Sequence, residues 1–248
     1  MLDDISKPGV ARFTASMLNE GTKNKTPEEL EEAIQLLGSN ISIRAGEENI
    51  TVYVSALARN FEKTLALVEE MLLEPRWDEE QFSINKTRTI NNLKRNLADP
   101  NYVADITFGK LVLGADNIHS TDISGTVESV EAITMDDLKA YYEKNISPSV
   151  ANFLIVGDVD QARVEKALAG LNEKWAAKEV AMPALTFPPA PEKSAIYFVD
   201  IPGAKQSVIN IGGPSMPRNH PDYYKADVAN FMLGGGVSAR LFMVLREE

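Results

Sequence analysis

The sequence contains no cysteine and only two histidines, His119 and His220. The missing cysteines exclude disulfide bonds, thiolate metal sites and a cysteine nucleophile, and they leave the cellular compartment open. Neither histidine has a second histidine one helical turn away, which is the spacing that many zinc sites use. We therefore expect both histidines to have surface or capping roles.

Basic residues are outnumbered: 25 Lys and Arg stand against 36 Asp and Glu, giving a net charge of −11. An acidic chain repels nucleic acid and anionic lipid, so we expect neither as a partner. No apolar run approaches the roughly 18–20 residues of a membrane helix, and we expect no membrane insertion. Residues 1–4 lack the basic start and apolar stretch of a signal peptide. The localisation stays unknown, with bacterial periplasm or cytoplasm favoured over the mitochondrial matrix.

The common catalytic signatures are also missing. No G-x-S-x-G nucleophile elbow, no phosphate loop ending in G-K-[ST] and no G-x-G-x-x-G fingerprint occurs. The acidic run TPEELEE is typical of a solvated helix face near a favourable helix dipole. By composition and spacing alone, the chain therefore offers no catalytic constellation.

Helix signals are strong in the first 175 residues. Thr26, Pro27 and Glu29 form the pattern of a capping box, apolar residues follow at helical spacing, and Gly38 ends the helix. Thr134 and Asp137 repeat the cap before a second helix. The predicted helices after the first lie at 60–73, 78–97, 101–113, 135–144 and 160–175.

Alternating apolar residues predict strands. Residues 41–45 and 50–57 alternate on either side of the turn GEEN, which predicts a β-hairpin with one buried face. Residues 150–159 (VANFLIVGDV), and later SAIYFVD and QSVINIGG, predict further strands. The fold class expected is α+β, with helices packed on one face of a mostly antiparallel sheet.

A proline-rich segment divides the chain. We predict a first α+β domain over residues 1–180, a linker over 181–193, and the start of a second α+β domain over 194–248. The first domain is poor in strands at its front, so we expect a strand to precede residue 1. The second stops in mid-helix, and both ends are expected to be boundaries within a longer protein.

Several motifs follow one another in an order that resembles the pitrilysin/insulinase family of zinc metallopeptidases. That family carries H-x-x-E-H on a helix, followed by M-L-x-x-G-T and a helix ending in L-G. Here residues 17–22 read MLNEGT and residues 37–38 read LG. Three later segments are similar to family motifs in the same order: LLEPRWDEEQF, GTVESVEAITMDDLKAYYEKNISPSVANFLIVGDV and MLGGGVSARLFMVLREE.

The resemblance places the zinc motif on residues that cannot bind zinc. The first histidine falls on Arg12, the glutamate on Ala15, the second histidine on Ser16, and the later glutamate ligand on Asn92. We call these residues the four zinc-motif positions. Arg12 puts a fixed positive charge where a dication would sit. Without ligands no zinc is held and no bound water becomes a nucleophile.

The family pairs two similar halves, of which one holds zinc and the other is degenerate. The resemblance therefore implies a non-catalytic half or subunit, inactive by itself, that contributes to peptide binding and assembles with a catalytic partner carrying the zinc. It also implies that Gly234, Gly235 and Gly236 contact the peptide, by analogy with a glycine-rich stretch of processing peptidases. Arg240 joins them as the arginine of the family's serine-arginine step. The alternatives are a structural scaffold with the same fold, or an enzyme with a different site.

Overall fold

The computed structural model describes residues 3–182, 189 and 193–247. These residues form two compact units, of which the first extends to Asn210 and the second begins at Ile211. Each unit is described by itself. The predicted linker at 181–193 lies mostly outside the described residues, so the predicted domain boundary stays a prediction.

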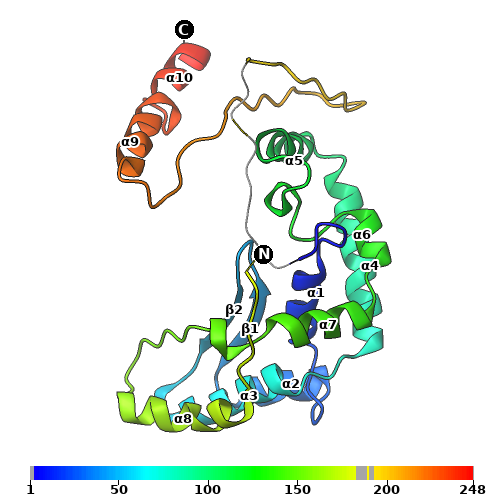
Figure 1. Ribbon diagram of the computed structural model, residues 1–248, viewed down its shortest axis with the longest axis vertical. Coiled ribbons are helices and arrows are strands. Elements are labelled where there is room, and N and C mark those ends of the chain that lie inside the picture. Colours follow the sequence, from blue (N-terminus) through cyan, green and yellow to red (C-terminus); the bar gives the residue numbers. More distant parts are fainter. Residues whose placement is uncertain (1–2, 183–188, 190–192, 248) are drawn as a thin grey trace. The chain divides into compact units, whose positions relative to one another are not determined.

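The helices of the first unit form where local signals place them. In α2 (Pro27–Leu36), the Glu29 N–H donates to Thr26 Oγ1 and the Thr26 N–H donates to the Glu29 carboxylate, at 3.2 and 2.8 Å. The same capping box begins α7 (Met135–Asn145) at Thr134. The other helices are α1 (Val10–Met17), α3 (Phe61–Leu73), α4 (Glu79–Asn96), α5 (Pro100–Leu113), α6 (Val127–Ala132) and α8 (Gln161–Lys174), with short 3₁₀ turns η1 (Ala58–Asn60), η2 (Ile118–Ser120) and η3 (Pro148–Val150) (Figure 1).

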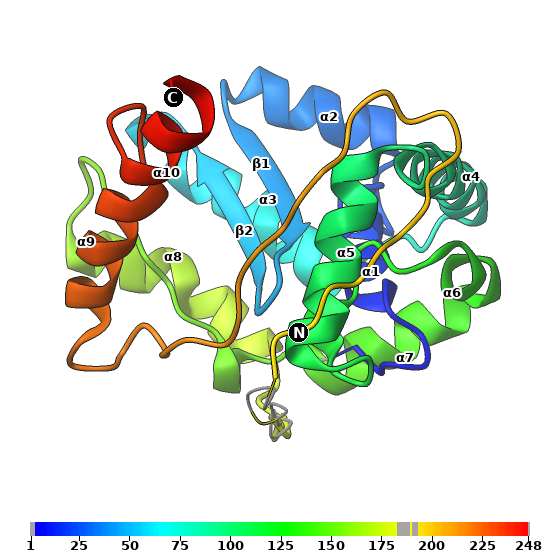
Figure 2. The ribbon, with the colours of Figure 1, turned by 90° about the horizontal axis from the view of Figure 1, so that it is seen from above.

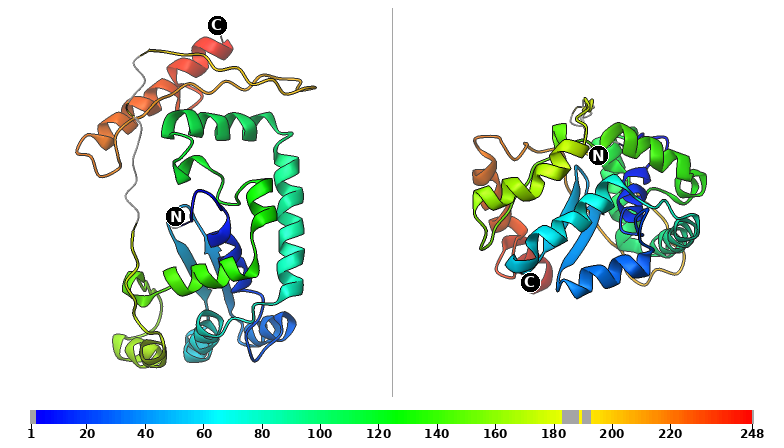
Figure 3. Two further views of the ribbon diagram at one scale, coloured as in Figure 1. Left: turned by 45° about the vertical axis from the view of Figure 1, so that its right-hand side comes forward. Right: turned by 90° about the horizontal axis from the view of Figure 1, so that it is seen from below.

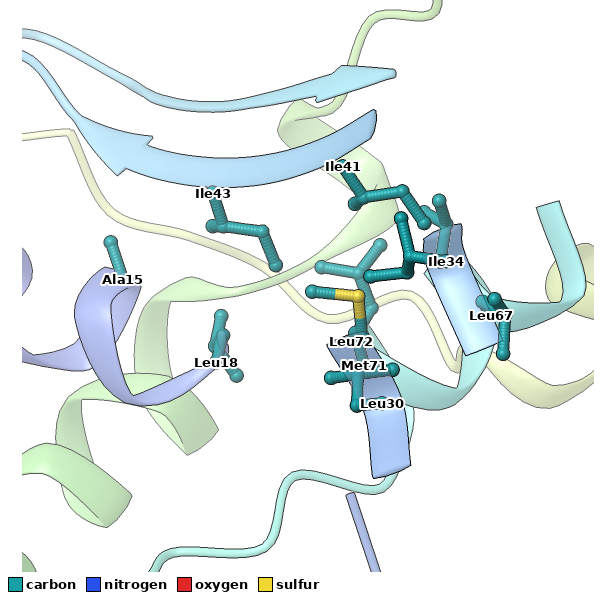
Figure 4. Close-up of a cluster of buried hydrophobic side chains, with 10 residues drawn as sticks. Ala15, Leu18, Leu30, Ile34, Ile41, Ile43, Leu67, Met71 and Leu72 are labelled. Carbon is teal, nitrogen blue, oxygen red and sulfur yellow. The ribbon is translucent and has the colours of Figure 1, made fainter. Parts of the chain in front are cut away.

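The predicted hairpin is confirmed. Strands β1 (Asn40–Ala45) and β2 (Ile50–Ser55) pair antiparallel, with Ile43 opposite Val52. Alternation turns Ile41 and Ile43 of β1 toward the helices, as Figure 4 shows. The fold is thus α+β, with a small antiparallel sheet covered by helices.

The other predicted strands are wrong. Residues 150–159 form no strand, and Leu154 and Val156 are 91% and 92% exposed. Residues 194–213 form none either, and Ile196 is 99% exposed. Their patterns fit a half-buried strand, but a strand also needs a neighbour that supplies backbone hydrogen bonds. Within the described residues, β1 and β2 are the only strands paired in a sheet.

Two buried clusters meet at α1. One fills the space between the hairpin and α1, α2 and α3, and it contains Ala15, Leu18, Ile43 and Met71 (Figures 2 and 4). The other joins α1 to α4, α6 and α7, which Figure 3 shows from a second side. Helix α1 is consequently buried on two faces, which fixes its position and orientation.

The second unit contains α9 (Tyr223–Gly234), the single-turn α10 (Arg240–Phe242) and the π-helical turn η4 (Met243–Glu247). Helix α9 ends at Gly234, the first of three consecutive glycines. In the described part of the chain, no helix combines the length and apolar character that crossing a membrane requires.

Candidate functional site

Helix α1 leaves one row of polar side chains incompletely buried. The Asp3 carboxylate caps its start by accepting the N–H groups of Gly9 and Ala11 at 2.9 and 2.7 Å. Burial raises the pKa of Asp3 above its ordinary value, although the two N–H donors act in the opposite direction. From Val10 to Leu18, Arg12 and Ser16 alone escape full burial, one helical turn apart.

The four zinc-motif positions separate in the structure. Arg12 and Asn92 line one cavity of about 340 Å³ beside α1 and α4. Ser16 is instead contacted by Asn85, whose Nδ2 lies 3.4 Å from Ser16 Oγ. Ala15 is 1% exposed and lies in the cluster on the hairpin side. The fold thus brings Arg12 and Asn92 together and directs Ala15, where the resemblance places the glutamate, into the core.

The cavity is polar and carries two guanidinium groups. The Arg12 guanidinium donates to Ser124 Oγ, and the Arg95 guanidinium donates to Asn92 Oδ1. The cavity is lined by Arg12, Thr89, Asn92, Leu93, Arg95, Asn96, Asp122 and Ser124. Its only acidic lining residue is Asp122, so the lining carries two positive charges and one negative charge.

Asp122 is held by neighbours other than the arginines. Its carboxylate accepts the Ser124 N–H at 2.7 Å. Burial, followed by the charge of Asp122 and a hydrogen bond to it, raises the pKa of Tyr102 to about 12. Tyr102 therefore stays a neutral donor toward Asp122 at physiological pH.

The residues at the zinc-motif positions do not fit a zinc ion. They offer a guanidinium, a methyl group, a hydroxyl and an amide in place of two imidazoles and two carboxylates. Across residues 3–182, 189 and 193–247, no group of three or more His, Asp or Glu side chains is arranged to hold a metal. His220 Nδ1 accepts the Asp222 N–H at 3.1 Å just before α9, a capping role.

The predicted peptide-contact residues lie around the end of α9. Gly235 follows the helix as its C-cap, and a Cβ atom there would lie 2.4 Å from the Phe231 ring. Close packing therefore accounts for this glycine without a ligand. Arg240 begins α10 and is exposed. The contact of Gly234, Gly235, Gly236 and Arg240 with a peptide stays a prediction.

Sequence reasoning missed Arg95, Asp122 and Ser124. Arg95 lies one turn beyond Asn92 on α4, so helical spacing from the predicted ligand position would have found it. Asp122 and Ser124 come from a polar loop far from α1 in the chain, and no local pattern connects them to it.

The comparisons with known proteins agree with the motif order. Residues 1–111 match the family "Insulinase (Peptidase family M16)", and residues 132–248 match "Peptidase M16 inactive domain". An uncharacterized zinc protease of Streptomyces coelicolor is 26% identical over 97% of the chain and 53% of its own length. The non-peptidase homolog YmxG of Helicobacter pylori is 25% identical over 100% of the chain and 56% of its own length.

A solved structure shares the fold. The peptidase M16 inactive domain from Pseudomonas fluorescens superposes with a TM-score of 0.80 at 23% identity, covering 98% of this chain and 58% of that one. The chain thus spans a little over half the length of the relatives it matches.

Proposed function

The chain belongs to the insulinase (M16) family of peptidases, and we propose that it is a non-catalytic member that binds peptide together with a zinc-bearing half or subunit. The observation that carries this proposal is the cavity at α1. Arg12 and Asn92 line it together, so a guanidinium and an amide stand at two of the three positions that the resemblance assigns to metal ligands.

Two features argue against zinc chemistry at this place. A guanidinium stays protonated at any physiological pH, so Arg12 repels a dication permanently. Ala15 lies in the core next to the hairpin, at the position of the family's glutamate, and supplies no proton acceptor. The chain can therefore keep the family's fold while the hydrolytic step depends on another polypeptide segment.

Peptide binding and assembly are supported by family membership and by the resemblance of its motifs. M16 peptidases typically consist of two similar halves, and a half without ligands can still contribute binding surface. Binding energy from groups remote from the reacting bond can raise the rate by positioning the substrate. We expect this contribution, and no bond cleavage, from the present chain.

The test uses the chain with and without an M16 partner that carries an intact H-x-x-E-H motif, the first choice being one encoded beside it. The chain alone, purified from zinc-containing buffer, should hold no stoichiometric zinc by elemental analysis and should not cleave an unstructured peptide mixture. Co-expression should yield a complex with chelator-sensitive cleavage that exceeds the activity of the partner alone.

Two results would overturn the proposal. Tightly bound zinc with cleavage by the chain alone would make it a peptidase. A stable complex in which this chain adds neither peptide affinity nor rate would make it a structural scaffold. A partner variant without its glutamate base is the matched control, because it preserves assembly while removing hydrolysis.

A further inference from the structure

We propose that the cavity lined by Arg12, Arg95 and Asn92 binds a carboxylate group of a peptide. The carboxylate part of this proposal rests on the cavity alone, whereas the peptide part rests on the proposed function. The carboxylate can come from an acidic side chain or from the C-terminus of the peptide, because both present the same group.

Arg12 and Arg95 both retain N–H donors for a ligand. Arg12 and Arg95 each donate to a neutral oxygen, on Ser124 and Asn92 respectively. In the part of the chain that the structure describes, neither guanidinium forms an ion pair. Each guanidinium has five N–H donors in a planar fork that matches a carboxylate, so both retain donors that can face a ligand.

The hydrophobic core fixes the backbone positions of these arginines. Phe13 of α1 and Phe82 of α4 pack edge to face, with ring centroids 6.1 Å apart. Leu93, which neighbours Asn92, is buried in the same cluster as Phe13. The spacing between α1 and α4 is therefore set by the core before any ligand arrives, which lowers the entropic cost of binding.

The charge balance of the lining also favours a carboxylate. The two arginines and Asp122 leave the lining with one excess positive charge, which a singly charged carboxylate neutralises. A doubly charged phosphate would leave excess negative charge beside Asp122. Asp122 does not take the ligand's place, because its carboxylate already accepts the Ser124 N–H and faces Tyr102.

Binding is measured by fluorescence anisotropy with three short labelled peptides of one neutral sequence. The first peptide carries its carboxylate on a single internal glutamate and has an amidated C-terminus. The second has glutamine in place of that glutamate and carries its carboxylate at a free C-terminus. The third has glutamine and an amidated C-terminus, so it has neither carboxylate. Each peptide is titrated with the whole chain at low and high salt. At least one carboxylate-bearing peptide should bind about five- to tenfold more tightly than the neutral one at low salt, and the difference should shrink at high salt.

Three cavity variants and one control variant assign this difference to the cavity. Arg12→Gln and Arg95→Gln should each remove most of the preference for the carboxylate. Arg88→Gln is the matched control, because Arg88 is an exposed arginine of α4, the helix of Arg95, and does not line the cavity. Asp122→Asn should strengthen carboxylate binding, an increase that a purely structural role of this loop would not produce. Unchanged unfolding curves confirm that the variants fold.

A separate titration keeps the two proposals distinguishable. Sodium acetate is added to ¹⁵N-labelled chain, and the Nε–H signals of Arg12 and Arg95 are followed by NMR, with sodium chloride at equal ionic strength as reference. Shifts specific to acetate, with Arg88 unaffected, support the carboxylate site even if no peptide binds to the chain, in which case the peptide part of this inference fails. Equal binding of all three peptides, unaffected by Arg12→Gln and Arg95→Gln, would overturn the carboxylate site and leave peptide binding standing.

Discussion

Replacing Ala15 by glutamate would place the family's carboxyl group inside the core between α1 and the hairpin. Ala15 is 1% exposed and shares a buried cluster with Leu18 and Ile43 (Figure 4). A carboxyl group in such surroundings is costly to ionise, because burial disfavours the charged form. We therefore expect the substitution to destabilise the fold in a pH-dependent way, rather than to create a base.

The magnitude follows from the shift in pKa. The introduced carboxyl has an ordinary pKa of about 4.3 when the chain is unfolded, and burial should raise its pKa by about 2–3 units in the folded chain. Each unit is worth about 1.36 kcal/mol, so this shift should lower the free energy of unfolding by about 2.5–3.5 kcal/mol at pH 7. The folded state binds the proton more tightly, so the loss is absent below pH 4 and grows as the pH rises toward the raised pKa.

Urea unfolding between pH 4 and 8 tests this reasoning on the wild type, Ala15→Glu and Ala15→Gln. Glutamine has nearly the same size and polarity but no charge, so both variants should share a steric cost of about 1–3 kcal/mol. The free energy of unfolding of the glutamate variant should fall below that of the glutamine variant only as the pH rises. Equal stability of the two variants at pH 7 would refute the assignment of position 15 to the core.

Three further predictions concern single regions of the first unit. Restoring His, Glu, His and Glu at the four zinc-motif positions together should permit weak metal binding without turnover, because the side chains that would orient each ligand, and a partner half, are missing. Chelator-sensitive peptide cleavage seen by mass spectrometry would contradict this. Thr26→Ala removes the capping box of α2 and should lower the free energy of unfolding by about 1 kcal/mol in urea, whereas Thr26→Ser should preserve most of it. Gly125→Ala should lower the free energy of unfolding by about 2–3 kcal/mol. Gly125 has φ +82°, and a Cβ atom there would lie 2.3 Å from the Pro8 carbonyl oxygen. A thermal unfolding midpoint equal to that of the wild type would disprove this close approach.

Several features of this protein could be predicted from the amino-acid sequence, because they depend on residue types or on residues close together in the chain. A capping box involves only four consecutive residues, so the boxes at Thr26 and Thr134 predict the starts of α2 and α7 independently of the tertiary structure. The hairpin is equally local, because a short turn joins its two strands. The loss of zinc ligands at the four zinc-motif positions can also be predicted from the sequence, since neither alanine nor a protonated arginine can bind a metal in any fold.

Only the tertiary structure decided the features that depend on residues far apart in the chain. Residues 150–159 carry the alternation of a strand, yet pairing requires a neighbour, and no described strand lies beside them. Arg12 and Arg95 line one cavity only because the core packs α1 against α4 across more than sixty intervening residues, which no local pattern encodes. Ala15 faces the hairpin for the same reason: helical periodicity sets which residues share a face, and only packing decides what that face meets.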